Sequence, residues 1–152
     1  MKASVGFGFF LLFLAGFALI TLKTTRDKAA NAVPTVVELS ASAWRPSHIG
    51  ETAVDDDSAL FVQFEADGAL RGHGGCNNFF SRYQLDGNKI HVEPIGISRM
   101  ACAPEIMSIE LSFVQALQLA TTVAGVDKRM TMRNDQGQAT VRFDAIDRQE
   151  SQ

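Results

Sequence analysis

The sequence predicts an α+β domain, mainly of antiparallel β-strands with one packed α-helix, preceded by an N-terminal transmembrane helix. Three observations support this fold class. The chain begins with a long uncharged apolar run, Ala3 to Leu22. Short segments of strand character, separated by turn residues, come later, and one stretch of helical periodicity interrupts them after Pro104. The 152 residues suffice for one domain with a modest core.

The run Ala3 to Leu22 has the length of a membrane-spanning helix. Its twenty residues would extend about 30 Å, the thickness of the hydrocarbon core of a bilayer. A cleaved signal peptide is the alternative, but its apolar region usually has about 7–15 residues with a small-residue cleavage site close behind. Here Ala30-Asn31-Ala32 lies beyond the charged segment 23–28. We therefore expect residues 1–28 to be a membrane anchor or signal segment, with an uncleaved anchor favoured, and residues 29–40 to be a linker.

The charge of the remaining domain argues against one class of partner. Residues 1–28 hold four of the 14 basic and one of the 17 acidic side chains. Ten basic and sixteen acidic side chains remain, a formal charge of −6. Because an acidic domain without a lysine and arginine cluster matches a phosphate backbone poorly, we expect no nucleic-acid partner.

Two hairpins are predicted in the first half of the domain. Ala66-Asp67-Gly68 and Asp86-Gly87-Asn88 are turn sequences, and Asp-Gly between alternating segments is a strong hairpin signal. The strands on either side of these turns are expected at 59–65, 69–71, 79–85 and 89–95.

A helix is predicted over residues 104–124, followed by a last hairpin. Pro104 suits the first helical turn and Gly125 its end. Spacings of three and four residues predict one apolar face, made of Ile106, Ile109, Phe113, Leu117 and Ala120. The hairpin is expected to place Met130 and Met132 against residues 139–143, with a turn at 134–137.

The segment Gly72-His73-Gly74-Gly75 has the composition of a phosphate loop, a metal site or a tight turn. A phosphate loop needs its glycines before a helix N-terminus, whereas these lead into Phe79-Phe80 and a strand. We expect the glycines to shape a turn or bulge. The acidic run Asp55-Asp56-Asp57 lacks the ligand spacing and the glycine of a calcium loop, and we expect a solvated loop there. Trp44 is expected to be a core aromatic near the first strand.

The two cysteines, Cys76 and Cys102, have three conceivable uses. A closed metal site would need two further ligands among His48, His73 and His91, none of which forms a recognisable pair. A cysteine nucleophile would need a base, and His73 is the candidate near Cys76. In an exported domain two cysteines are the minimum for a disulfide, which would contribute roughly 3–4 kcal/mol by its loop length. We favour the disulfide, with free buried thiols and the catalytic or metal uses as alternatives.

Several short motifs together resemble the META domain (HslJ-like) family. They lie in the order Gly75-Cys76-Asn77-Asn78-Phe79-Phe80, Tyr83, Asp86-Gly87 and Arg99-Met100-Ala101-Cys102. Glu110, Phe113, Ala116 and Leu117 continue the resemblance, which extends from about Trp44 to Phe143. The chain departs from the family pattern at Pro46, Ser81-Arg82 and Ile97-Ser98.

The resemblance implies a small antiparallel β-barrel or strongly curved sheet with one packed helix. It places the META domain at residues 41–147 and leaves a tail at 148–152. The family is common in bacterial envelope proteins and is linked with stress and antibiotic tolerance, without an established catalytic activity. These implications favour a binding or structural module.

We therefore expect a non-enzymatic, membrane-tethered envelope domain that binds a partner protein or a small envelope component, without a cofactor, a metal or catalytic residues. The expected location is the membrane, with the domain on the periplasmic side; secretion to the periplasm after signal cleavage is the alternative. The distribution of basic residues around the apolar run does not settle the orientation. A cysteine-dependent enzyme that uses Cys76 with His73, or an inhibitor-like module that docks on an envelope enzyme, are the alternative functions.

Overall fold

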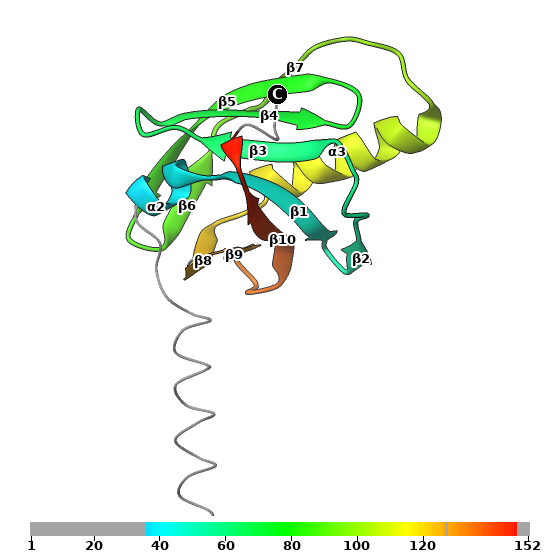
Figure 1. Ribbon diagram of the computed structural model, residues 1–152. Coiled ribbons are helices and arrows are strands. Elements are labelled where there is room, and N and C mark those ends of the chain that lie inside the picture. Colours follow the sequence, from blue (N-terminus) through cyan, green and yellow to red (C-terminus); the bar gives the residue numbers. More distant parts are fainter. Residues whose placement is uncertain (1–35, 127, 149–152) are drawn as a thin grey trace, which may run out of the picture. The chain divides into compact units, whose positions relative to one another are not determined.

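The computed structural model describes residues 36–126 and 128–148 (Figure 1). In this part of the chain, ten strands form one antiparallel sheet and two helices accompany it. The helices are α2 (Val36–Ala41) and α3 (Pro104–Gln118). The strands are β1 (Ala43–Ile49), β2 (Thr52–Ala53), β3 (Leu60–Phe64), β4 (Ala69–Gly74), β5 (Asn78–Asp86), β6 (Lys89–Val92), β7 (Gly96–Ile97), β8 (Thr122–Val126), β9 (Arg129–Arg133) and β10 (Ala139–Ile146).

The sheet curves so far that β10, at one end of the strand path, pairs with β1, the next-to-last strand at the other end. Hydrogen-bonded neighbours follow the path β10–β9–β8–β6–β5–β4–β3–β1–β2, and β10 also pairs with β1. The link between β6 and β8 is short, since Lys89 and Thr122 form its one register pair. The predicted small β-barrel is therefore corrected to a curved, mainly antiparallel sheet, because so short a link does not complete a regular barrel.

The predicted hairpins are confirmed. Gly68 and Gly87 lie at the turns between β3 and β4 and between β5 and β6, with φ of 82° and 58°. Such left-handed φ values are readily available to glycine, which is why these dipeptides predict tight turns. The β5–β6 pairing then runs from Asp86 opposite Lys89 to Tyr83 opposite Val92.

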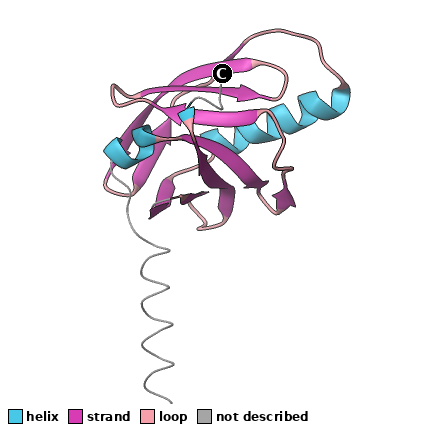
Figure 2. Ribbon diagram, in the orientation of Figure 1, coloured by secondary structure: helices cyan, strands magenta, loops and turns pink. Residues whose placement is uncertain are grey.

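The core lies between the curved sheet and α3. Burial alternates along β3, where Leu60, Val62 and Phe64 point inward. Helix α3 contacts β1, β4, β6 and β10, and Figure 2 shows it against the sheet. The ring of Phe113 is edge-on to Phe79 at 5.8 Å and to Phe143 at 6.2 Å. Each fully buried side chain of this size contributes about 1.5–3 kcal/mol, so these rings hold α3 against β5 and β10.

The helix is shorter than predicted. It ends at Gln118, and residues 122–126 form β8, which makes a hairpin with β9. The β-branched residues Thr121, Thr122 and Val123 favour a strand there. Gly125 lies within β8, with φ of 125°, and a Cβ atom on it would be 2.4 Å from the carbonyl oxygen of Arg129. This glycine therefore permits a close backbone approach and does not end the helix.

The predicted apolar face of the helix is only partly correct. Phe113, Leu117 and Ala120 are buried, whereas Ile106 and Ile109 are 40% and 45% exposed. Ile106 lies beside Gly75, in the turn between β4 and β5, and Ile109 lies beside the segment 52–58, so these two side chains lie outside the core.

The N-terminal boundary of the domain lies earlier than predicted. Residues 36–41 form α2, and Leu39, within the predicted linker 29–40, is fully buried in the core. The indole Nε1 of Trp44 donates a hydrogen bond to the carbonyl of Leu39 at 2.9 Å, which fixes α2 against β1. Trp44 is 3% exposed, as expected of a core aromatic. Pro46, which lacks an N–H, is accommodated at a register shift between Pro46 and His48.

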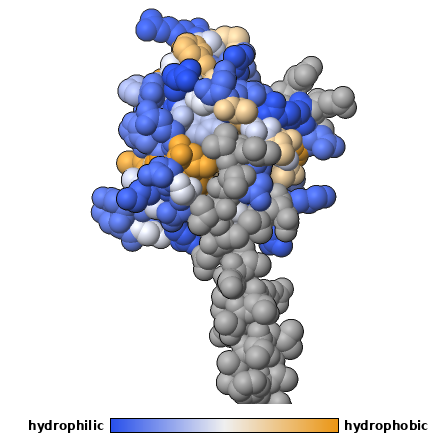
Figure 3. Space-filling model, turned by 90° about the vertical axis from the view of Figure 1, so that its left-hand side faces the viewer, coloured by the Kyte–Doolittle hydropathy of each residue, from blue (hydrophilic) through white to orange (hydrophobic). Residues whose placement is uncertain are grey.

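The predicted transmembrane run Ala3 to Leu22 lies outside the described residues. Among the helices that the structure does describe, none is long and apolar enough to cross a membrane. On the face of the domain in Figure 3, hydrophilic residues surround a few separated hydrophobic ones.

Candidate functional site

The glycine motif forms the turn between β4 and β5. Gly75 has φ of 95°, and the N–H of Gly74 donates to the carbonyl of Asn77 at 2.8 Å. A Cβ atom on Gly74 would lie 2.5 Å from Cγ of Glu110. Gly75 therefore shapes the turn, as predicted, and Gly74 makes room for a helix side chain.

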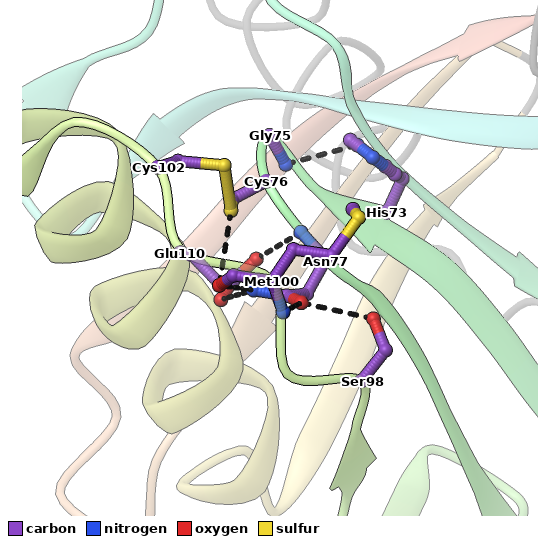
Figure 4. Close-up of a disulfide and its surroundings, with 8 residues drawn as sticks. All are labelled: His73, Gly75, Cys76, Asn77, Ser98, Met100, Cys102 and Glu110. Carbon is purple, nitrogen blue, oxygen red and sulfur yellow. Dashed lines mark hydrogen bonds between the residues drawn. A yellow bond between two sulfur atoms is a disulfide. The ribbon is translucent and has the colours of Figure 1, made fainter.

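Asn77 is the centre of a buried polar network (Figure 4). Its backbone N–H donates to Oε2 of Glu110 at 2.6 Å, and its side-chain Nδ2 donates to Oε1 at 2.9 Å. Its Oδ1 accepts from the hydroxyl of Ser98 at 2.9 Å and from the N–H of Met100 at 2.7 Å. Asn77 is 3% exposed and Glu110 6%. One side chain thus joins the motif turn, α3 and the segment 98–100.

The network explains why a carboxylate lies on the buried side of α3. Burial of an ionised group is unfavourable unless donors satisfy it, and the two N–H groups of Asn77 supply them. Glu110 falls among the apolar spacings of the predicted helix, between Ile106 and Phe113. An acidic residue in such a register was the available signal of a buried partner, but the partner itself, Asn77, is 33 residues away.

The structure joins Cys76 and Cys102 in a disulfide, which confirms the favoured use of the two cysteines. The bond links the motif turn to the segment before α3, the same two parts that Asn77 connects. Sulfur atoms bonded to each other provide no thiol nucleophile and no thiolate ligand. Among the described residues, no group of three or more histidine, cysteine or acidic side chains is placed to hold a metal ion.

His73 is directed away from a catalytic pairing with Cys76. Its Nδ1 lies 3.0 Å from the backbone nitrogen of Gly75, which donates to it, and 3.2 Å from the carbonyl oxygen of Ala59. The ring stacks on Phe61 with centroids 6.3 Å apart. His73 therefore stabilises the turn by accepting the hydrogen bond from Gly75, on the outer side of the sheet.

The remaining motif residues are structural or exposed. Phe79 is buried, whereas Asn78 is exposed and its carbonyl accepts from the N–H of Ser98 at 3.0 Å. Tyr83 is buried, and its hydroxyl donates to the carbonyl of Glu65 at 2.9 Å. Burial raises the pKa of Tyr83 above 10.0, and the charges of Asp67 and Glu65 act in the same direction. The motif residues with exposed side chains before α3 are Arg99, Met100 and Ala101.

A groove of about 410 Å³ lies beside the motif turn, between the segment 52–58 and the first turns of α3. Leu60 lines this groove. A Cβ atom on Gly75 would lie 3.4 Å from the side chain of Leu60, so the turn packs against a residue of the groove wall. The full lining is Ile49, Thr52, Ala53, Val54, Asp55, Asp57, Ser58, Leu60, Ser108, Ile109 and Ser112. No sequence motif indicated it, because separate segments meet there only through the tertiary fold.

A second hollow, of about 630 Å³, covers the outer face of β3, β4 and β5. It is wider and more open than the groove. Arg71 lies in it with Phe61 and Phe80, and Phe80 is 64% exposed. The ring of Phe80 covers Gly96 of β7, where a Cβ atom would be 2.7 Å from the ring. The exposed aromatic therefore has a packing role at the sheet edge.

Comparisons with known proteins agree on the fold. A protein from Burkholderia xenovorans, solved by NMR, is similar with a TM-score of 0.60 and 24% identity, over 78% of this chain and 92% of that one. A crystal structure of a DUF4847 family protein from Bacteroides vulgatus has a TM-score of 0.57 and 14% identity, over 72% of this chain and 96% of that one. No curated protein matches the chain.

The family itself follows from the sequence of the domain. The family model described as "META domain" matches residues 37–147, a range that includes α2, the motif turn, α3 and the closing hairpin. The chain belongs to the META domain family.

Proposed function

We propose that this META domain is a non-enzymatic binding module of the cell envelope, tethered to the membrane by Ala3 to Leu22 with the domain on the periplasmic side. The observation that carries the proposal is the Cys76–Cys102 disulfide. Such bonds form and persist in oxidising compartments and are rare in a reducing cytosol. A role in stress tolerance or envelope maintenance fits this location.

The use of the motif residues supports binding over catalysis. Asn77 uses its polar atoms on Glu110 and on the segment 98–100, and Cys76 is oxidised. These residues connect the turn between β4 and β5, α3 and the segment 98–100. The groove lined by Leu60 lies next to that turn, and we propose it as the ligand-binding site. Pockets of about 300–1,000 Å³ are the usual size for small ligands, so we propose a small envelope component as the bound species.

The compartment is tested by the oxidation state of the cysteines. Cells that express the full chain are quenched with acid, and the protein is alkylated before or after reduction and weighed by mass spectrometry. We expect both sulfur atoms to be blocked until reduction. A chain that begins at residue 29 remains in the cytosol and is expected to be alkylated twice without reduction. Two free thiols in the full chain would reject the periplasmic location.

The tether is tested by fractionation. The full chain is expected in the membrane pellet after an alkaline wash, and the chain that begins at residue 29 in the soluble fraction. If both forms fractionate with membranes, the apolar run is not the tether. If expression of the full chain instead yields a soluble product that begins at Val33, signal cleavage is established.

A further inference from the structure

The groove beside the motif turn has one apolar side and one acidic side. Ile49, Leu60 and Ile109 of α3 line this apolar side, and Ile109 has 45% of its surface exposed. Ile109 is not part of the core, because the apolar residues that α3 contributes to the core begin at Phe113. An apolar body in the groove would bury surface of Ile109 and of the partly buried Ile49 that the domain alone leaves in water.

The acidic side is the segment 55–57. Asp55 and Asp57 line the groove, and Asp56 lies between them. None of the three forms a salt bridge in the described part of the chain, and no basic side chain lines the groove. The domain from residue 29 onward carries a formal charge of −6, so its overall negative potential adds to the negative potential of these three aspartates.

The remaining polar groups of the groove lie on both of its walls. The hydroxyl of Ser112 donates to the carbonyl of Ser108 at 2.9 Å, which leaves its oxygen lone pairs as acceptors. The Oγ of Ser58 is buried and has no hydrogen-bond partner. An ammonium group carries three donors and no acceptor, so carboxylate and hydroxyl oxygens satisfy it better than they satisfy an anion.

We propose that this groove binds small cationic amphiphiles, with the ammonium group at Asp55 and Asp57 and the apolar body on Ile49, Leu60 and Ile109. The inference rests on the proposed function of the domain as a binding module and names the chemical class of its ligand. The groove volume of about 410 Å³ suits a small molecule and not a folded partner.

The segment that carries the aspartates is held in place before a ligand arrives. The N–H of Val54 donates to the carbonyl of Ser47 at 3.0 Å, and the N–H of Ser58 donates to the carbonyl of Asp55 at 3.0 Å. Binding then requires little ordering of the protein backbone, and preorganisation of this kind favours affinity.

The test uses residues 29–152, labelled with ¹⁵N. This part is suitable because its core lies within the described residues and because the similar solved structures carry the same fold over 92% and 96% of their chains. Hexylammonium, hexanoate and 1-hexanol are the probes, since they share one apolar body and differ in charge. Backbone shifts in the NMR spectrum report the site and the dissociation constant.

We expect saturable binding of hexylammonium, with the largest shifts at Ser58, Ser108 and Ile109. Hexanol is expected to bind at least tenfold more weakly, and hexanoate more weakly still. The double variant Asp55→Asn/Asp57→Asn is expected to lose at least tenfold in affinity for hexylammonium. The control Asp86→Asn/Asp135→Asn removes the same charge from two exposed positions outside the groove and is expected to change the affinity less than twofold.

A third variant, Ile109→Ser, tests the apolar side and is expected to weaken hexylammonium and hexanol alike. Equal binding of the cation and the anion, shifts centred on β3 to β5 instead of the groove, or an unchanged affinity in Asp55→Asn/Asp57→Asn would each overturn the proposal, as would the absence of saturable binding. These failures would leave the oxidation and fractionation tests of the proposed function unaffected, so the two proposals fail separately.

Discussion

Asn77 binds both carboxylate oxygens of Glu110, one through its backbone N–H at 2.6 Å and one through its side chain at 2.9 Å. The two residues lie on different elements, a strand turn and a helix, 33 positions apart. Because the same asparagine also accepts from Ser98 and Met100, the segment between β7 and α3 is held by this pair as well. The pair therefore links three parts of the chain: the turn between β4 and β5, α3 and the segment 98–100.

Asn77→Ala is expected to destabilise the domain by about 2–4 kcal/mol, because it removes the side-chain partners of Oε1 of the buried Glu110, of the Ser98 hydroxyl and of the Met100 N–H. The measurement is urea unfolding followed by the fluorescence of Trp44, the single tryptophan of the chain. Asn78→Ala is the matched control, since Asn78 is the exposed neighbour, and a change within about 0.5 kcal/mol is expected there. Equal effects of the two substitutions would contradict a stabilising role for the hydrogen bonds of the Asn77 side chain.

Gly74→Ala is expected to cost roughly 1–3 kcal/mol, as overpacking of a core usually does. The new Cβ would be 2.5 Å from Cγ of Glu110. A double-mutant cycle with Glu110→Ala identifies the cause, because removal of the glutamate side chain removes the clash. We expect a coupling energy of more than about 1 kcal/mol, in the range found for residues in contact. Additive effects would show that Gly74 is required for another reason.

Local chemistry made the hairpins and the core predictable. Asp67-Gly68 and Asp86-Gly87 specify tight turns by backbone conformation alone, so the adjacent strands lie where the sequence places them. Phe113 and Leu117 are buried as their spacing predicts. The favoured pairing of Cys76 with Cys102 is also correct, since the disulfide is present.

The errors arose where tertiary contacts decide the outcome. The predicted helix includes residues 122–124, but β-branched side chains and the close approach of Gly125 to Arg129 make residues 122–126 a strand. Leu39 has no motif around it, and its burial depends on packing beside Trp44. The groove likewise requires α3 and the segment 52–58 to meet, which no local pattern encodes.

Loss of the disulfide in Cys76→Ser/Cys102→Ser is expected to destabilise the domain by roughly 3–4 kcal/mol. The bond spans 26 positions, and a loop of that length constrains the unfolded chain by about this amount. Urea unfolding of the variant and of the reduced wild-type domain should agree, since both lack the same cross-link. A variant as stable as the oxidised protein would show that Asn77 and Glu110 alone hold the two segments together.

Tyr83 is expected to titrate above pH 10.0 in the folded domain, because burial, together with the charges of Asp67 and Glu65, disfavours the tyrosinate. Absorbance at the tyrosinate band reports this residue directly, as the chain has one tyrosine. A folded-state pKa above the unfolded value means that the contribution to stability is complete below pH 10.0 and is lost as the pH rises through the folded pKa. Tyr83→Phe removes that pH dependence and the hydrogen bond to the carbonyl of Glu65, at a cost of about 1 kcal/mol near neutral pH. A midpoint at or below 10.0 in the folded protein, with the ordinary value recovered in urea, would reverse the sign and reject the argument from burial.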